Sequence, residues 1–128
     1  MKILLDTCAF IWISLKPEML SPSARESFSD GNNEVFLSSV SALEIAHKYQ
    51  IGKLPLPEPP HLFTPTEREA MGVQALPLFE KDCRHYQRLP LLHRDPFDRL
   101  LVCQAIENCC SIMTPDKLIR QYEAPVIW

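Results

Sequence analysis

Glycine is scarce in this chain, and its scarcity excludes several kinds of phosphate-binding site. Only three of the 128 residues are glycine, and they form neither a G-x-x-x-x-G-K loop nor a G-x-G-x-x-G turn. The G-x-S-x-G motif that carries a nucleophilic serine is also missing. The sequence therefore gives no support to a protein with a glycine-rich phosphate loop or to a serine hydrolase.

Paired cysteines are missing as well. The five cysteines are odd in number, Cys109 and Cys110 are adjacent, and no C-x-x-C pair occurs. Neither a disulfide framework nor a zinc ribbon is therefore indicated. Cysteine at an apolar helical position behaves as a small core residue. We expect free thiols and a reducing compartment.

The chain also lacks long apolar runs and an excess of basic residues. No run is long enough to span a bilayer, and the N-terminal segment reaches a carboxylate at Asp6, too early for a signal peptide. We therefore expect a cytoplasmic protein with no membrane partner. The net charge of −3 argues against a simple nucleic-acid-binding module, which usually carries a basic patch. It does not argue against an enzyme whose acidic site binds a metal ion and its substrate together.

Short apolar segments alternate with helical segments along the chain. Strands are predicted at 2–5, 34–38, 73–77, 111–114 and 124–128. Helices are predicted at 9–15, 22–30, 41–51, 66–71, 80–88, 96–106 and 115–122, with an extended proline-rich loop at 53–60. At 128 residues we expect one domain. The alternation predicts an α/β fold with a mainly parallel central sheet and helices on both faces.

Four acidic residues lie close to the predicted strand ends, where ligands bind in sheets of this kind. Asp6 directly follows the first strand, Glu44 lies in the first turn of the helix after the second, and Asp116 comes just past the fourth. Asp98 starts the helix that leads into the fourth strand, so it reaches the same edge if that helix runs antiparallel to the strands. We expect the four carboxylates to meet there.

Each of these acids also has an ordinary structural explanation. Asp6 can cap the helix that follows it, and Asp116 can favour the start of the next helix through the helix dipole. Glu44 can form a capping box with Ser41 or an ion pair with Lys48. These roles still leave four acids that repel one another at one edge of the sheet. A hard divalent cation would remove that cost, and Mg²⁺ and Mn²⁺ favour carboxylate and water ligands.

The segment around Asp98 opens the most apolar helix of the chain. Asp95 can cap this helix, and Pro96 suits its first position. Because the helix is apolar nearly all round, we expect Asp98 to face the protein interior or a cleft. A carboxylate in such a place needs a partner, either Arg94 or Arg99 or a metal ion.

The histidines are not expected to belong to a metal site. The four of them are scattered without ligand spacing, and no cluster of histidine and cysteine competes as a soft-metal site. We expect solvated or core positions for these side chains, which are His47, His61, His85 and His93.

Several segments, taken together and in this order, resemble one family. They are Leu4–Thr7, Ser38–Ala46, Gly52–Pro57, His93–Leu101, Thr114–Asp116 and the closing Val126–Trp128. The chain is similar to PIN-domain ribonucleases of the VapC type, the toxins of bacterial type II toxin–antitoxin pairs. The resemblance covers nearly the whole chain, and it implies a single PIN domain over residues 1–128 with a three-layer sandwich fold.

The resemblance also implies a site and a reaction. Asp6, Glu44, Asp98 and Asp116 would be the catalytic acids, with Asp6 and Asp98 as direct ligands of Mg²⁺ or Mn²⁺. Asp98 matches the family pattern better than its neighbour Asp95. The implied reaction is metal-assisted hydrolysis of an RNA phosphodiester, in which Glu44 or Asp116 takes the proton of the attacking water or holds a second metal. Those two roles stay open at this point.

The implied partners are RNA, a cognate antitoxin and a second copy of the chain. In the family the antitoxin covers the site, often with a basic side chain that reaches the acids. Candidate contacts to the RNA backbone are Arg94, Arg99, Lys48 and Lys53, although surface solubility explains the lysines equally well.

Two other functions compete with this interpretation. A non-catalytic interaction module would keep the fold and an antitoxin-like partner but cleave nothing, and the complete set of acids argues against it. A phosphotransferase with Asp6 as nucleophile would usually carry a second acid two residues on. That position is Cys8, where relatives in the resembling family often carry histidine.

Overall fold

Five parallel strands form the centre of the molecule. The computed structural model describes residues 1–128, and its strands are β1 (Lys2–Leu5), β2 (Glu34–Ser38), β3 (Gln74–Leu76), β4 (Ser111–Met113) and β5 (Val126–Ile127). They lie in the order β3-β2-β1-β4-β5, and every neighbouring pair is parallel. The predicted α/β class is confirmed, and so is each of the five strands.

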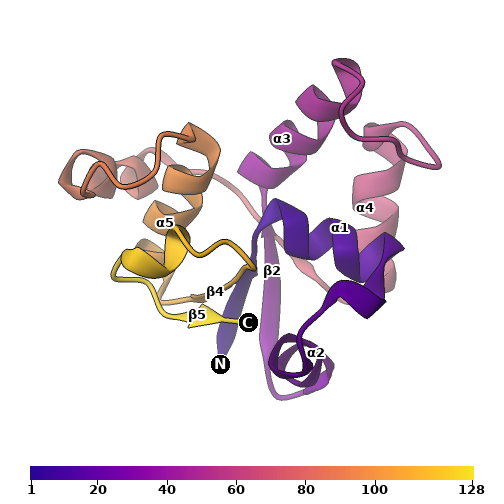
Figure 1. Ribbon diagram of the computed structural model, residues 1–128, viewed down its shortest axis with the longest axis horizontal. Helices are drawn as coiled ribbons and strands as arrows, with labels where there is room; N and C mark the ends of the chain where they lie inside the picture. The colour runs from indigo at the N-terminus through magenta and orange to yellow at the C-terminus, as the bar shows by residue number, and fades with distance from the viewer.

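Helices cover both faces of this sheet (Figure 1). The α-helices are α1 (Thr7–Leu15), α2 (Pro22–Ser29), α3 (Ser39–Gln50), α4 (Pro60–Ala70) and α5 (Pro96–Asn108). Short 3₁₀ helices are η1 (Pro17–Met19), η2 (Glu80–Arg88) and η3 (Ile119–Gln121). None of the helices is both long and apolar enough to cross a membrane.

The central strand β1 contributes side chains to two separate hydrophobic cores. Ile3 and Leu5 point to one face, where they pack with Phe10 of α1 and Phe63 of α4. Leu4 points to the opposite face and packs with apolar side chains of α5. Successive residues of a strand face opposite sides, so a strand covered on both sides reads as a continuous apolar run. The three layers follow from this alternation.

Two predicted helices have different bounds in the structure. The helix expected at 66–71 begins at Pro60, inside the segment predicted as a loop, and Pro65 lies within it. Burial of Phe63 in the core offsets the backbone hydrogen bond that Pro65 cannot donate. The helix expected at 41–51 begins at Ser39, because the Ser38 hydroxyl caps it by accepting from the Val40 N–H at 2.9 Å.

Two further segments predicted as α-helices are tighter or shorter than expected. Residues 80–88 form the 3₁₀ helix η2, whose buried Asp82 accepts from the Phe79 N–H at 2.7 Å. Residues 115–122 contain only the 3₁₀ turn η3. There Asp116 accepts from the Leu118 N–H at 2.8 Å, and such a local side-chain bond competes with a helical start.

Candidate active site

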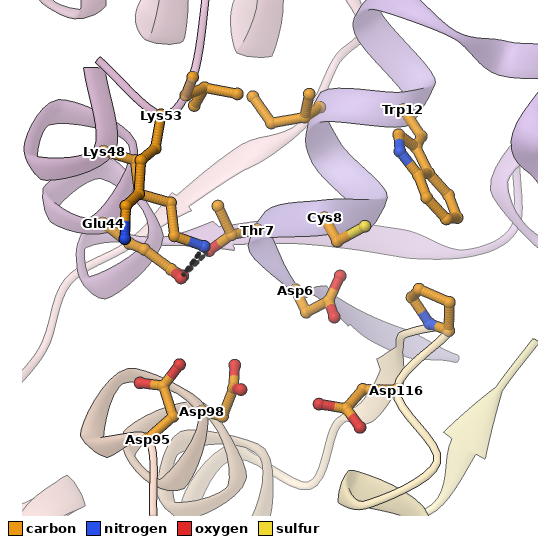
Figure 2. A pocket seen from close by; sticks show the side chains of 13 residues that line it. Asp6, Thr7, Cys8, Trp12, Glu44, Lys48, Lys53, Asp95, Asp98 and Asp116 are labelled. Carbon is orange, nitrogen blue, oxygen red and sulfur yellow. Dashed lines mark hydrogen bonds and ion pairs between the residues drawn. The ribbon is translucent and has the colours of Figure 1, made fainter. Parts of the chain in front are cut away.

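The carboxyl edge of the sheet carries a cavity of about 460 Å³. Acidic side chains from four distant parts of the chain line it, together with Cys8, Trp12 and two lysines. Figure 2 shows the carboxylates of Asp6, Asp98 and Asp116 pointing toward one another across this cavity. The expected meeting of Asp6, Glu44, Asp98 and Asp116 at one edge is confirmed, because all four line the cavity.

Asp6 lies at the junction of β1 and α1. Its backbone N–H continues the sheet by donating to the Met113 carbonyl at 3.1 Å. One carboxylate oxygen accepts from the Ala9 N–H at 2.6 Å and so caps α1, and the other accepts from the Thr114 hydroxyl. The expected capping role is confirmed. It does not take Asp6 out of the cavity, so the side chain does both.

Glu44 is buried on α3 and faces the cavity from the β2 side. The Thr7 hydroxyl donates to Oε1 at 2.5 Å, and the Lys48 ammonium lies 2.8 Å from Oε2. The predicted ion pair with Lys48 is therefore confirmed. The predicted capping box with Ser41 is wrong, because the helix begins two residues earlier and the Ser41 hydroxyl has no hydrogen-bond partner.

Asp98 and Asp116 lie on the opposite side of the cavity. Asp95 caps α5 through its Oδ1, which accepts from the Phe97 N–H at 2.9 Å, as predicted. Asp98 then falls in the first turn of the helix, and Asp116 follows β4 beyond Thr114. The Thr114 hydroxyl oxygen accepts from the Asp116 N–H at 3.0 Å, so one threonine links the Asp6 and Asp116 positions.

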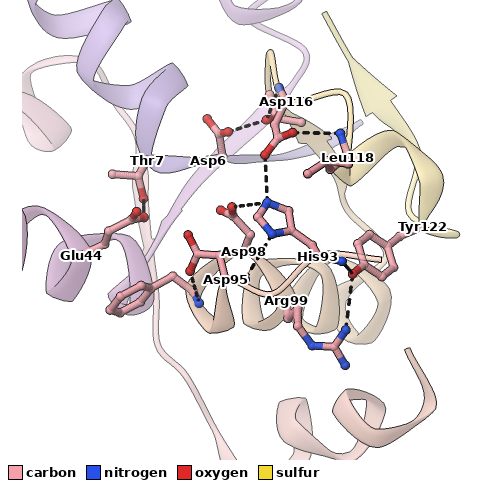
Figure 3. Close-up of polar contacts among 12 residues, drawn as sticks. Asp6, Thr7, Glu44, His93, Asp95, Asp98, Arg99, Asp116, Leu118 and Tyr122 are labelled. Carbon is pink, nitrogen blue, oxygen red and sulfur yellow. Dashed lines mark hydrogen bonds and ion pairs between the residues drawn. The ribbon is translucent and has the colours of Figure 1, made fainter. Parts of the chain in front are cut away.

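The partner of Asp98 is His93 and not an arginine. His93 Nε2 lies 2.9 Å from Asp98 Oδ2 and 3.1 Å from Asp116 Oδ2 (Figure 3). The expectation that all four histidines are solvated or in the core is wrong for this one. Sequence spacing gave no sign of it, because His93 sits in a loop five residues ahead of Asp98 and 23 residues from Asp116.

The two arginines beside Asp98 point elsewhere. Arg99 is buried, and its guanidinium donates to the carbonyls of Pro90 at 2.9 Å and Tyr86 at 3.1 Å. It also lies over the Tyr86 ring, 4.6 Å from the centroid. Arg99 is therefore neither a partner of Asp98 nor a contact for RNA, contrary to both expectations. Arg94 is exposed and forms no ion pair with an acid.

Burial leaves the charge of Asp6 poorly compensated. Desolvation raises the pKa of Asp6 to about 6, against the hydrogen bonds from Thr114 and Ala9, which lower it. The charges of Glu44 and Asp116 raise the pKa further. The carboxylate is thus disfavoured in the metal-free cavity, and a bound cation would favour it.

Asp98 shows the same effect more strongly. Desolvation raises its pKa to about 7, and the charges of Asp95 and Glu44 add to the rise, while His93 opposes it. Carboxyls with raised pKa values mark a cavity with too much negative charge for its own cations. This is the electrostatic condition in which a divalent ion is bound by oxygen ligands. The residues present therefore fit a hard divalent cation.

The hydrogen bonds leave one carboxylate oxygen of the four acids without a donor. Both oxygens of Asp6, Glu44 and Asp116 receive a hydrogen bond or an ion pair from the protein. Asp98 receives one only at Oδ2, from His93. Asp98 Oδ1 is therefore the least engaged oxygen of the four acids.

Cys8 and Lys48 complete the cavity wall. Burial, followed by the charge of Asp6, raises the pKa of the Cys8 thiol to about 11, so Cys8 is a neutral thiol near pH 7. Burial lowers the pKa of Lys48, but its hydrogen bond to Glu44 and the surrounding acids outweigh that effect and raise it. The cavity thus holds a charged ammonium beside its acids, with Lys53 near it (Figure 2).

An acidic cavity at the carboxyl edge of a parallel sheet is chemically a place for a cation and an anionic ligand. Comparison with known proteins identifies the family. The chain matches the PIN domain family over residues 3–125, and it belongs to that family. It is 40% identical over 52 residues to Ribonuclease VapC16 of Mycobacterium tuberculosis. That match covers 41% of this chain and 37% of the relative, well under two thirds of the relative's length.

Solved structures of low identity share the fold over nearly the whole chain. The structure of VapBC2 from Rickettsia felis, bound to a DNA fragment from their promoter, matches with a TM-score of 0.68 and 17% identity, over 98% of this chain and 97% of that one. VapBC-1 from nontypeable Haemophilus influenzae matches with a TM-score of 0.64 and 16% identity, over 98% and 96%. The predicted resemblance to VapC-type PIN proteins is confirmed.

Proposed function

We propose that this chain is a divalent-cation-dependent endoribonuclease and the toxin of a toxin–antitoxin pair. In this proposal Asp6 and Asp98 are the direct ligands of Mg²⁺, with Mn²⁺ as a second suitable ion. The observation that carries the proposal is the convergence of Asp6, Glu44, Asp98 and Asp116 on one cavity, where Asp6 and Asp98 have raised pKa values. Membership of the PIN family and the likeness to Ribonuclease VapC16 support the choice of RNA as substrate.

In this proposal Asp6, Asp98 and Asp116 act on the metal ion and its water, whereas Glu44 acts on the lysines of the cavity wall. When bound, the metal ion would activate a water molecule and offset the charge that develops on the phosphoryl oxygens. Asp98 offers Oδ1, which no protein donor engages, and Asp6 is held in place by its bonds to Ala9 and Thr114. Asp116 is the more accessible of the two remaining acids, so we assign to it the water proton.

Glu44 has a different role in this proposal. Its two oxygens are engaged by Thr7 and Lys48, so it holds the Lys48 ammonium at the cavity wall. Lys48 and Lys53 line the same wall and would bind the RNA backbone, which an acidic cavity would otherwise repel. Loss of Glu44 would then weaken RNA binding as well as the metal site.

Cleavage of RNA by the purified protein tests this proposal. We expect cleavage with Mg²⁺ or Mn²⁺, none with EDTA, and a loss of at least about a hundredfold in Asp98→Asn, since metal ligation contributes several kcal/mol to such reactions. Asp95→Asn is the matched control. It removes the same charge from the same cavity and keeps a good helix cap, so cleavage is retained. RNA that stays intact with every divalent ion would favour the non-catalytic interaction module.

The partners are part of the proposal. We propose an antitoxin partner, and the similarity of the fold to the structures of VapBC2 and VapBC-1 supports it. We further propose, from the family resemblance, that this partner covers the cavity with a basic side chain. We also propose a cytoplasmic homodimer built from one PIN domain per chain. Expression of the chain without its antitoxin should arrest growth, and Asp98→Ala should relieve the arrest. Growth arrest that persists in Asp98→Ala would separate toxicity from the acidic site.

A further inference from the structure

Both ring nitrogens of His93 have hydrogen-bond partners. Nε2 lies 2.9 Å from Asp98 Oδ2 and 3.1 Å from Asp116 Oδ2, while Nδ1 lies 3.1 Å from the backbone nitrogen of Asp95. Its own backbone N–H donates to the Tyr122 hydroxyl at 2.8 Å. Figure 3 shows the ring between Asp98 and Asp116, with the Asp95 side chain to its left in this view. Nothing in the proposed reaction has used this side chain.

These contacts define which nitrogen carries the ring proton. The Asp95 backbone N–H can only donate, so Nδ1 must offer a lone pair to it. The ring form that satisfies all three contacts therefore carries its proton on Nε2 alone. That proton points between two carboxylate oxygens, both of which accept. Nε2 is thus a donor shared by Asp98 and Asp116.

The same three side chains also have the spacing of a metal triad. One ligand atom each of His93, Asp98 and Asp116 lies within 4.8 Å of the others. Ligation by Nε2 would require the ring proton to move to Nδ1, where it would face the Asp95 N–H, and two donors would then oppose each other. A metal-bound histidine usually donates its other ring N–H to an acceptor, and here the neighbour is a donor.

We infer that His93 is a positioning residue of the metal site and not one of its ligands. Its Nε2–H holds Asp98 Oδ2 and Asp116 Oδ2 on the protein side, so that Asp98 Oδ1 is left free for the cavity. The shared proton also offsets the repulsion between the two carboxylates. This inference deepens the proposed function and rests on it for the identity of the cation, but the position of the proton on the ring does not depend on catalysis.

The ring proton can be observed directly by NMR. In the metal-free protein labelled with ¹⁵N-histidine, we expect long-range ¹H–¹⁵N spectra to show a protonated Nε2 and an unprotonated Nδ1 for His93. Addition of Mg²⁺ should leave this pattern unchanged. The His93 signals are assigned by their loss in His93→Gln. A proton on Nδ1, or loss of the Nε2 proton when Mg²⁺ is added, would overturn the inference.

Mg²⁺ and Mn²⁺ binding by His93→Ala and His93→Gln shows whether His93 acts as a hydrogen-bond donor or as a metal ligand. Gln keeps an N–H donor at the reach of Nε2 but has no ring nitrogen, whereas Ala removes the donor. We expect calorimetry to show that His93→Ala weakens Mg²⁺ and Mn²⁺ binding equally, by roughly tenfold or more, as loss of an outer partner of a metal ligand does. His93→Gln should recover most of that loss.

A ligand role would give the opposite pattern. Gln would fail as Ala does, and Mn²⁺, which accepts imidazole more readily than Mg²⁺, would lose more affinity. Unchanged Mg²⁺ binding in His93→Ala would also overturn the inference. His85→Gln is the control, because His85 pairs with Glu107 away from the cavity. A wild-type protein that binds no Mg²⁺ would refute the proposed function instead, and the NMR pattern would still decide the state of His93.

Discussion

Replacing Asp6 with Asn should stabilise the metal-free protein while it destroys the metal site. Asp6 is 4% exposed, so few water molecules can solvate its charge. Asn can keep both contacts: its carbonyl oxygen accepts from the Ala9 N–H, and its amide donates to the Thr114 hydroxyl oxygen. Asn is also as good a helix cap as Asp. The substitution therefore removes a charge with little change in shape.

The magnitude follows from the pKa of Asp6. The folded protein raises that pKa from 3.8 to about 6, so the folded state holds the proton more tightly than the unfolded state. The resulting stabilisation is fully present below pH 3.8 and is lost as the pH rises through about 6. A shift of about two units corresponds to about 3 kcal/mol. The stability of Asp6→Asn relative to wild type should thus grow by about 3 kcal/mol over that pH range.

Urea unfolding of both proteins in EDTA, at several pH values on either side of this range, measures the effect. Circular dichroism follows the fold, and Trp12, which lies 5.7 Å from the Trp128 ring and lines the cavity, gives a fluorescence signal. Mg²⁺ should then stabilise the wild type and leave Asp6→Asn unchanged, since only the wild type binds it. A stability difference that does not change with pH would refute the electrostatic argument.

Three further outcomes are expected. Mg²⁺ affinity, measured by calorimetry, should fall as the pH drops below about 7, because protons compete with the cation at Asp98 and then at Asp6, and a flat profile would exclude both as ligands. Thr114→Val should weaken Mg²⁺ binding and raise the pKa of Asp6, since the hydroxyl bond that lowers it is lost; unchanged binding would remove Thr114 from the site. Arg99→Ala should cost about 3 kcal/mol in unfolding free energy, because the partly buried carbonyls of Tyr86 and Pro90 lose their donor, and Mg²⁺ affinity of the folded protein should not change.

The sheet and three of its acids could be predicted because their signals are local. β1 is a continuous apolar run, and the residue after it, Asp6, can only lie at the carboxyl edge. The same logic places Asp116 after β4 and Glu44 on the helix after β2. Asp98 needed one more condition, that α5 runs back toward that edge, and the structure meets it. These predictions rest on the parallel topology, which places the carboxyl ends of all strands at one edge of the sheet.

The errors concern side chains whose partners are distant in the sequence. The sequence offers Arg99 as one possible partner of Asp98 because the two are adjacent, yet its guanidinium donates to the carbonyls of Tyr86 in η2 and of Pro90 after it. The sequence does not connect His93 with an acid, because it lacks ligand spacing and its partner Asp116 follows a different strand. Thr7 and Thr114 lie in segments that carry the family resemblance, but a hydroxyl that donates to a carboxylate leaves no sequence pattern that would predict their contacts with Glu44 and Asp6.

The position of a bound ion is the most direct test of whether Asp6 and Asp98 hold a divalent cation. Crystals soaked with Mn²⁺ can be measured for anomalous scattering, which locates the ion without reference to activity. We expect one ion or a close pair at the carboxyl edge of the sheet, bonded to oxygens of Asp98 and Asp6 and to no nitrogen of His93. An empty cavity, or an ion held by other residues, in a preparation that cleaves RNA would contradict it.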